Sequence, residues 1–278
     1  WLVRDSATPI APERCVVVTF TNRAANEMRA RLESMIGADR TRRLVLGTFH
    51  AVCVRFLRRW GTRLGLDPRF TIADTDDARR LLRDVERDAD AALSAISRAK
   101  AHGWTPDELR ASAQHAPGSP AHTENLALCR TYAAYQQQLR TSHALDFDDL
   151  LLLGVRLFRE HPELTTHIDH VLVDEFQDTN AVQYELLRRL SRHVSVVGDP
   201  DQSIYSWRHA DVRHIERMHL DFPGLHRVLL EENYRSTPQI LEAALRVMQQ
   251  DPHRLPKGLY TALASGPPVS VVACHDAD

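Results

Sequence analysis

Three short runs of apolar, mostly β-branched residues stand out along the chain, at positions 15–20, 171–173 and 194–197. Each run is continuous rather than alternating, which is typical of a strand buried on both faces of a parallel sheet. Polar residues follow each run at once, beginning with Thr21, Asp174 and Gly198. Because parallel sheets bind ligands beyond the carboxyl ends of their strands, functional residues are expected at these three junctions.

Apolar residues at helical spacing predict amphipathic helices between these strands. One stripe covers residues 25–35, between a cap at Thr21 or Asn22 and a stop at Gly37. A second stripe covers residues 49–60 and ends at the next glycine. Helices that alternate with buried strands indicate the α/β class, with helices packed on a parallel sheet.

Residues 75–145 differ in composition, with Arg-, Asp- and Ala-rich helical stretches and a Pro-Gly-Ser-Pro break at 117–120. Apolar residues return at helical spacing over 126–139, so we interpret the region as a helical insertion between strands of one sheet. Further along, a helix start at 233–238 and a strand-like run at 269–272 predict the beginning of a second α/β domain.

The chain has 278 residues, and its 35 Lys and Arg nearly balance its 37 Asp and Glu, for a formal net charge of −2. Any DNA-binding patch must therefore be local. The longest uncharged apolar stretch, residues 150–155, is far shorter than the ~20 residues that cross a bilayer, so no transmembrane segment is expected. Residues 1–15 contain no signal peptide and begin with Trp rather than Met, so the chain is expected to be a piece of something longer.

Cysteine and histidine usage narrows the candidate chemistry. The four cysteines lie too far apart for a Cys-x-x-Cys pair and are too few for a disulfide scaffold, which indicates reduced, intracellular thiols. The 15 histidines form no His-Glu-x-x-His motif and no close cluster with cysteine, so a zinc site is not expected.

Asp174 and Glu175 close the second strand, where two carboxylates can meet a ligand at the sheet edge. In a nucleotide hydrolase such an Asp holds Mg²⁺, and the adjacent Glu orients or deprotonates the attacking water. Taken alone, an Asp-Glu pair after a strand is more often a helix cap.

The third strand leads into a loop that offers contacts to both a nucleotide and DNA. Gln202 can hydrogen-bond a phosphate or its attacking water. Stacking and cationic surfaces for unpaired bases come from Tyr205, Trp207 and Arg208. Taken alone, Trp207 would be interpreted as a core aromatic, because most Trp side chains are largely buried.

Two further motifs have both a chemical and a structural interpretation. Arg235, preceded by Tyr234, is the type of residue that reaches a γ-phosphate from an opposing domain, with a surface ion pair as the alternative. The acidic string at 146–149 can bind a metal, but its place before a leucine run favours a helix cap with acidic residues in the first turn.

Six strings occur in a fixed order along the chain. They are Thr19–Ala25 (TFTNRAA), Gly47–His50 (GTFH), Asp146–Leu150 (DFDDL), Asp174–Thr179 (DEFQDT), Gly198–Arg208 and Asn233–Thr237 (NYRST). Taken together, they resemble the UvrD/PcrA/Rep family of superfamily 1 DNA helicases, and the resemblance covers nearly the whole chain.

This resemblance implies an α/β fold in which a RecA-like, parallel-sheet P-loop NTPase motor domain contains an inserted helical subdomain and precedes the start of a second RecA-like domain. Residues 1–67 and 145–227 are then the first motor domain, lacking its phosphate loop. Residues 68–144 are the inserted DNA-binding subdomain, and residues 228–278 are the start of the second motor domain. In such helicases ATP lies between the motor domains, single-stranded DNA lies across the top, and movement is 3′ to 5′.

The resemblance also implies roles for individual residues in ATP hydrolysis. Asp174 resembles the Mg²⁺ carboxylate, and Glu175 resembles the base for the attacking water. Gln202 resembles the γ-phosphate sensor, Arg235 the arginine finger, and Tyr234 the ring that stacks on adenine. ATP and Mg²⁺ are therefore the implied cofactors.

Seven residues match positions that line the path of single-stranded DNA in the family: Phe20, Asn22, Thr48, His50, Tyr205, Trp207 and Arg208. Because Gln202 and Trp207 lie on one loop, closing of the ATP cleft is expected to shift the base-stacking surface. The implied partners are single-stranded DNA and single/double-strand junctions, with repair or replication proteins as further partners and no membrane.

The chain also departs from the family pattern. The phosphate loop G-x-x-x-x-G-K-[ST] is absent, since neither Lys100 nor Lys257 follows a glycine; in the family it lies shortly upstream of the position of Trp1. The late motifs of the second motor domain would lie beyond Asp278. The chain as given is therefore expected to bind ATP poorly and to unwind nothing. His209 stands where the family often has glycine.

Three interpretations follow. The first is a fragment of an ATP-dependent 3′–5′ DNA helicase that unwinds duplex in DNA repair, replication or recombination. The second is an ATPase-deficient relic that binds single-stranded DNA or a partner protein, against which the intact catalytic pair argues. The third is a metal nuclease whose ligands would be Asp146, Asp148, Asp149 and Asp174. Two strings, Gly-Asp-Pro-Asp-Gln and Leu230–Arg235, favour eukaryotic members and hence the nucleus, with the bacterial cytoplasm as the alternative.

Overall fold

The structure of the chain is a computed structural model, which describes residues 2–3, 9–113, 120–191, 193–205, 210–251, 254 and 257–272. The chain divides into two compact units. The first unit comprises Trp1–Asp199 and Ser203–Arg217, and the second comprises Pro200–Gln202 and Met218–Asp278.

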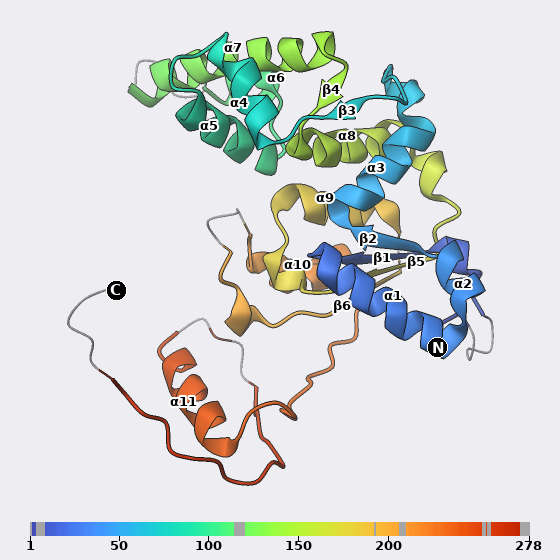
Figure 1. Cartoon of the computed structure of the whole chain (residues 1–278), viewed down its shortest axis with the longest axis vertical. Coiled ribbons are helices and arrows are strands. Elements are labelled where there is room, and N and C mark those ends of the chain that lie inside the picture. Colours follow the sequence, from blue (N-terminus) through green and yellow to red (C-terminus); the bar gives the residue numbers. More distant parts are fainter. Residues whose placement is uncertain are drawn as a thin grey trace. The chain divides into compact units, whose positions relative to one another are not determined.

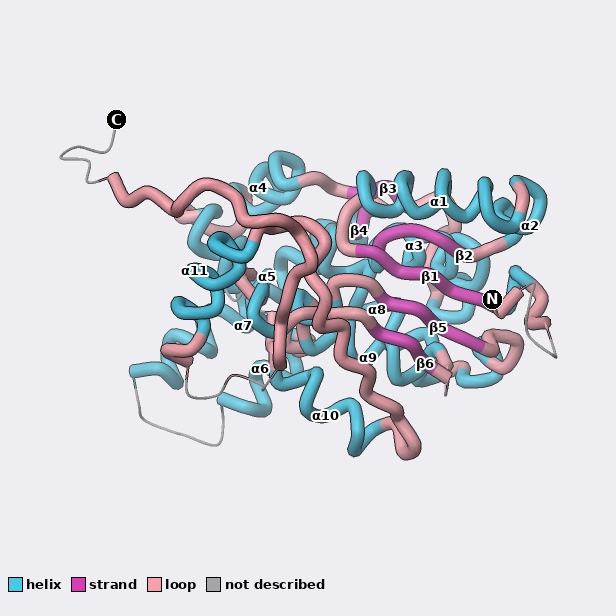
Figure 2. Tube along the Cα trace, turned by 90° about the horizontal axis from the view of Figure 1, so that it is seen from below, coloured by secondary structure: helices cyan, strands magenta, loops and turns pink. Residues whose placement is uncertain are grey.

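A parallel sheet forms the centre of the first unit (Figure 2). Its strands are β1 (Cys15–Thr19), β2 (Val45–Thr48), β5 (His170–Val173) and β6 (Val194–Val196), in the order β2-β1-β5-β6. All neighbouring pairs are parallel, so the carboxyl ends of the strands meet at one edge of the sheet. The predicted α/β class is confirmed.

Two details of the sheet differ from the prediction. β2 is an additional strand, which a search for long β-branched runs does not detect because it has four residues and contains Gly47. The prediction that β6 is buried on both faces is wrong, since Ser195 is exposed and its two neighbours are only partly buried. Within the described residues β6 pairs only with β5, so one of its edges has no strand beside it.

Helices cover both faces of the sheet (Figure 1). One face is covered by α1 (Asn22–Ile36) and α2 (Ala38–Arg43), and the other by α3 (Phe49–Trp60), α8 (Phe147–Glu160) and α9 (Ala181–Leu190). Ala25, Met28 and Leu32 of α1 form one core cluster with Val17 and Leu46 of the sheet. The helices predicted over 25–35 and 49–60 are therefore confirmed.

The predicted helical insertion is confirmed as well, and it has its own core. Its elements are β3 (Thr71–Ile72), α4 (Thr75–Arg83), α5 (Ala89–Ala101), α6 (Pro106–Ala113), α7 (Pro120–Thr141) and β4 (Ala144–Leu145). β3 and β4 pair in parallel where the chain leaves and re-enters the sheet-containing part. Cys129, Tyr132, Tyr135 and Leu139 of α7 pack together with Ile96 of α5, as the helical spacing over 126–139 predicts.

In the second unit, the described residues after α10 (Arg213–Asp221) form α11 (Pro238–Met248) and one isolated bridge between Glu232 and Tyr260. α11 follows an N-cap at Thr237, within the helix start predicted at 233–238. The strand predicted at 269–272 is wrong: these residues have no regular structure, and Val271 is 95% exposed. No strand within the described residues pairs with them.

The remaining elements are α10 (Arg213–Asp221) and the 3₁₀ turns η1 (Pro12–Arg14), η2 (Gly61–Leu64), η3 (Pro162–Thr165), η4 (Phe176–Asp178) and η5 (Pro200–Gln202). In the described part of the chain, no helix has both the length and the apolar character needed to span a bilayer. The three cysteines in this part are free and buried.

Candidate functional site

The carboxyl ends of β1 and β2 bring two of the predicted DNA-contacting strings side by side. Thr19 at the end of β1 is the register partner of Thr48 at the end of β2. Phe20 and Asn22 follow the first of these residues, and His50 follows the second. Parallel pairing, rather than proximity in sequence, therefore gathers these residues at one edge of the sheet.

Four of the predicted DNA contacts line one cavity of about 660 Å³ in the first unit, which we call the edge groove. They are Phe20, Asn22, Thr48 and His50. The insertion and α8 supply another part of the lining, with Ser94, Ser97, Ala101, Phe147, Asp148 and Leu151. The segment after β5 supplies Asp178, Asn180 and Gln183.

The N-termini of four helices lie at the edge groove. α1 and α3 have Thr21 and Thr48 as N-caps, whose hydroxyl oxygens accept hydrogen bonds from backbone N–H groups at 3.1 and 3.2 Å. α8 and α9 begin with capping boxes at Asp146 and Asn180. Because a helix N-terminus presents N–H groups and a partial positive charge, this arrangement attracts anionic groups such as phosphates.

Aromatic rings lie at the same groove. Phe20 stacks on Tyr205, another predicted DNA contact, with ring centroids 6.1 Å apart and an interplanar angle of 16°. His50 and Phe147 form a T-shaped pair, with centroids 5.8 Å apart. The Phe147 ring is 48% exposed, so it has a free surface on which a base can stack.

Sequence reasoning missed Phe147 and Asp148 as groove residues. The sequence pattern indicates a helix cap or a metal site for the string that contains them, and the family resemblance assigns no DNA contact to it. The cap is confirmed, because Asp146 accepts a hydrogen bond from the Asp149 backbone N–H at 2.8 Å and begins α8. The available signal was an aromatic residue at the first position of a capped helix, where a side chain lies outside the helix-packing face.

Two acidic side chains and one imidazole line the edge groove. Burial raises the pKa of Asp148 to about 6, and the charge of Asp146 adds to this effect. Burial also raises the pKa of Asp178, whose Oδ1 atom is buried without a hydrogen-bond partner. The pKa of His50 is lowered by burial, so the imidazole is neutral at pH 7. The fixed charge of the groove is therefore set mainly by the helix termini and the two carboxyl groups.

The predicted catalytic carboxylates lie at the end of β5, beyond the backbone bond from Asp174 N–H to the Val18 carbonyl. Glu175 has φ 52° and ψ 43°, the left-handed conformation that non-glycine residues seldom adopt. Its N–H donates to Asp174 Oδ1 at 3.1 Å, and its Oε2 accepts from Gln177 Nε2 at 2.8 Å. Strained backbone of this kind is concentrated at functional sites.

Gln177 connects the ends of β5 and β6. While its amide nitrogen donates to Glu175, its Oε1 atom accepts a hydrogen bond from Asp199 N–H at 3.0 Å. A Cβ atom at Gly198 would lie 2.8 Å from Gln177 Oε1, so any larger residue there would displace the Gln177 amide. Burial raises the pKa of Asp174, and the charge of Glu175 acts in the same direction. A carboxyl group with this electrostatic environment favours a nearby cation.

The other predicted nucleotide contacts, Gln202, Tyr234 and Arg235, belong to the second unit. Beside Gln202, Asp201 forms ion pairs with Arg254 at 2.9 Å and Lys257 at 2.8 Å. The Tyr234 hydroxyl donates to a neighbouring glutamate, and its side chain is 77% exposed. Two of the predicted DNA contacts, Trp207 and Arg208, lie outside the described residues, as does His209.

The acidic string and Asp174 do not form a nuclease site. Asp146 and Asp149 are bound by Lys100 at 2.6 and 2.7 Å, and Asp148 faces the edge groove. Within the described ranges no group of three or more His, Cys, Asp or Glu side chains is arranged to hold a metal. The metal-nuclease interpretation therefore has no structural basis.

Comparison with known proteins identifies the family. The model of the UvrD/REP helicase N-terminal domain matches residues 4–223. ATP-dependent DNA helicase PcrA of Staphylococcus epidermidis is 38% identical over 273 residues, and that of Staphylococcus aureus is 37% identical over 273 residues. Each alignment covers 92% of this chain, which spans 36% of the length of these curated relatives. Both relatives are bacterial, so the predicted nuclear location has no support. The chain belongs to the UvrD/REP helicase N-terminal domain family.

Proposed function

We propose that this chain supplies the single-strand-binding groove and the catalytic carboxylates of an ATP-dependent 3′–5′ DNA helicase that acts in DNA repair, replication or recombination. The observation that carries the proposal is the edge groove, where four helix N-termini lie together with the exposed ring of Phe147 and the partly buried ring of Phe20. Helix N-termini favour phosphates, and rings favour unpaired bases. Single-stranded DNA has both phosphates and unpaired bases, so it is the ligand that matches both features of the groove.

In this proposal the DNA contacts are Phe20, Asn22, Thr48, His50, Tyr205, Trp207 and Arg208, joined by Phe147. Stacking of one base on an aromatic ring contributes about 1–3 kcal/mol with little sequence preference. The two carboxyl groups of the groove repel phosphates, so the backbone of the strand follows the helix termini and the bases point toward the rings. Single/double-strand junctions, and repair or replication proteins, are further partners.

The nucleotide chemistry is assigned to the edge beyond β5. Asp174 offers the hard oxygen ligand that Mg²⁺ prefers, and one carboxylate with water and phosphate oxygens suffices for this ion. Glu175 accepts the proton of the attacking water. The hydrogen bond from Gln177 orients the Glu175 carboxylate. Gln202 contacts the γ-phosphate, Arg235 stabilises the transition state, and Tyr234 stacks on the adenine. The sequence contains no phosphate loop, so these residues fit only part of an ATP site.

The proposal is tested by DNA-stimulated ATP hydrolysis in the full-length protein. Glu175→Gln should remove nearly all hydrolysis, by about 10²–10⁴-fold, because it deletes the general base. Glu33→Gln, an exposed residue of α1, is the matched control and should leave the rate unchanged. Hydrolysis that is independent of single-stranded DNA, or that survives Glu175→Gln, would overturn the assignment.

The absent phosphate loop motivates the alternative, an ATPase-deficient relic that binds single-stranded DNA or a partner protein. Full-length protein that binds an oligonucleotide but hydrolyses no ATP would establish this alternative. For the source we infer a bacterium, and for the location its cytoplasm, on the basis of the two bacterial relatives.

A further inference from the structure

Lys100, at the end of α5, is the most completely buried charged side chain with two partners in the described part of the first unit, with 0% exposure of its side chain. Its Nζ atom lies 2.6 Å from Asp146 Oδ2 and 2.7 Å from Asp149 Oδ1. The nitrogen also lies 5.6 and 5.2 Å from the ring centroids of Tyr132 and Tyr135. None of the predicted catalytic or DNA-binding roles uses this lysine.

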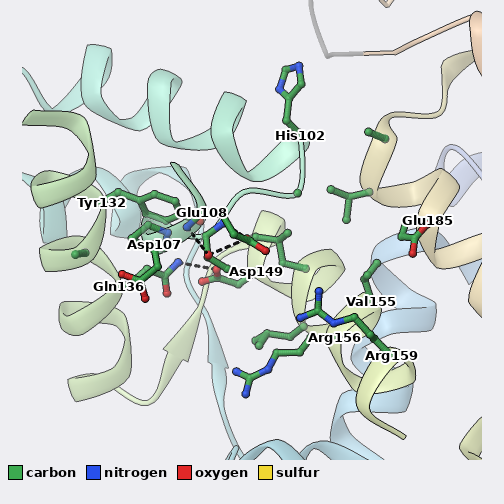
Figure 3. A pocket seen from close by; sticks show the side chains of 18 of the residues that line it. His102, Asp107, Glu108, Tyr132, Gln136, Asp149, Val155, Arg156, Arg159 and Glu185 are labelled. Atoms are coloured by element: carbon green, nitrogen blue, oxygen red, sulfur yellow. Dashed lines mark hydrogen bonds between the residues drawn. The ribbon is translucent and has the colours of Figure 1, made fainter. Parts of the chain in front are cut away.

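Each of the two carboxylates accepts a further side-chain hydrogen bond besides its ion pair with Lys100. Asp146 accepts a further hydrogen bond from the Tyr135 hydroxyl at 2.9 Å. Asp149 accepts one from Gln136 Nε2 at 2.7 Å, and Figure 3 shows Gln136 of α7 directed toward Asp149. Burial opposes the charge on Lys100, but Asp149 and Asp146 outweigh it and raise the pKa of the lysine. The ammonium group therefore stays charged, and its two ion pairs link the insertion to the start of α8.

The connected segment is the first turn of α8, and cavities lie on both of its sides. Phe147 and Asp148 line the edge groove, whereas Asp149 and Gln136 line a second cavity of about 580 Å³ (Figure 3). Ser97, one turn before Lys100 on α5, hydrogen-bonds to Asp148 from the groove side. Because neither cavity supplies close packing, polar contacts from α5 and α7 are what hold this turn in place.

We propose that Lys100 is a positioning residue for single-stranded DNA, which holds the first turn of α8 so that Phe147 presents its ring to the edge groove beside His50. This inference rests on the proposed function, since it assigns the helical insertion the task of shaping the DNA-binding surface. The lysine itself touches neither DNA nor nucleotide.

The central variant is Lys100→Met/Asp149→Asn, which keeps the net charge of the cluster at −1 because one cation and one anion are removed together. The asparagine oxygen can still accept from Gln136, so this variant is expected to fold where Lys100→Met alone leaves two buried carboxylates without their cation. Arg98→Met, an exposed residue of the same helix, is the matched control.

Two measurements on the full chain separate positioning from mere stability. The first is the ¹H NMR resonance of the His50 ring, assigned with His50→Gln, which senses the ring current of Phe147 at 5.8 Å. The second is the affinity for a fluorescein-labelled oligodeoxythymidylate by fluorescence anisotropy. In the double variant we expect the His50 resonance to move to its position in Phe147→Ala, and affinity to fall about 5- to 150-fold, the range for loss of one stacked base.

A double variant that unfolds like the unmodified chain, yet keeps both its His50 resonance and its affinity, overturns the inference. If conditions that restore the stability of the double variant also restore its affinity for the oligonucleotide, the inference is overturned as well, because Lys100 would then serve folding alone. If the unmodified chain binds no oligonucleotide, the proposed function fails, and the His50 resonance alone decides the inference: a shift supports positioning by Lys100, and an unshifted resonance overturns it.

Discussion

The two halves of α8 are held in opposite ways. From Leu150 to Phe158 the helix packs by shape, since Leu150 and Leu157 are fully buried and Phe158 meets the edge of Phe56 at a centroid distance of 5.2 Å. At its first turn the same helix is held by ions, through Lys100 and the two aspartates. The stability of residues 150–158 therefore depends on side-chain volume, and that of the first turn depends on the balance of charge.

This difference has a functional reason in the proposed DNA-binding surface. A close-packed helix start would have to bury its side chains, whereas a groove needs Phe147 and Asp148 accessible. Hydrogen bonds and ion pairs are directional, so they fix a turn with few contacts, but a single lost partner leaves the others uncompensated. The stability of the first turn of α8 should thus be more sensitive to loss of charge. Residues 150–158 of the helix should be more sensitive to added side-chain volume.

The largest effect is expected from Lys100→Met. Two buried carboxylates would lose their cation, and breaking such a buried pair typically costs about 3–5 kcal/mol of the free energy of unfolding. Urea denaturation followed by circular dichroism measures this loss. Arg98→Met should change stability by less than about 0.5 kcal/mol, as surface substitutions do. Equal effects of the two variants would contradict the contrast between the halves of α8.

Phe147→Ala should separate binding from folding. Because the ring is 48% exposed, its loss should change the free energy of unfolding little, whereas affinity for single-stranded DNA should fall by about 1–3 kcal/mol. Fluorescence anisotropy with a labelled oligonucleotide gives the affinity, and urea denaturation gives the stability. Lost stability with unchanged affinity would assign Phe147 to the packed half of the helix instead.

Apolar helix faces and helix caps were the more predictable features from sequence. Apolar periodicity located the helices that contain Phe56 and Tyr132, and the string beginning at Asp146 indicated a helix cap, which the capping box confirms. These signals are local, because a helix face or a cap is defined within a few residues. The same locality explains why β6 was predicted to be buried, since its place in the sheet depends on pairing with distant strands.

The ion pairs that hold the first turn of α8 could not be predicted in the same way. Lys100 lies in an Ala-rich helix, where a lysine is ordinarily a solvated residue, and its partner Asp146 is 46 residues away. The edge groove was half predictable: family motifs supplied Phe20 and His50, but the contributions of α5 and α8 depend on how the insertion packs. The roles of these residues in DNA binding and catalysis stay predictions.

Gly154→Ala tests the packed half by adding volume. A Cβ atom at Gly154 would lie 2.9 Å from Cys53 Sγ, and overpacking of this kind costs about 1–3 kcal/mol. The better helix propensity of alanine returns about 1 kcal/mol, so a net loss of about 1 kcal/mol is expected in urea denaturation. In a Cys53→Ala background the same change should become neutral or stabilising. A loss that persists in this background would place the clash elsewhere.

The smallest expected effect is a dependence of DNA binding on pH through Asp148. Its folded-state pKa is raised by burial to about 6 from the ordinary 3.8, so the carboxyl group gains its charge as pH rises through 6. The titratable and charged groups around it are His50 of α3, Lys100 of α5, Asp149 of α8, the N-cap Asp146, and Asp178 of η4. Since protonation removes a negative charge from the groove, affinity for an oligonucleotide should rise as pH falls from above 6 to below it.

One unit charge ~8 Å from a phosphate in water contributes about 0.5 kcal/mol, so the change should be about twofold in affinity. Asp148→Asn should bind at high pH as the unmodified chain binds at low pH. It should keep only the residual rise due to protonation of His50, whose pKa burial holds below 6.5. The same substitution should also increase the free energy of unfolding at pH 7 but not at pH 3, because the raised pKa destabilises the fold only where Asp148 is charged. A pH profile of affinity that is identical in Asp148→Asn would show that the first turn of α8 presents its carboxyl group away from the strand.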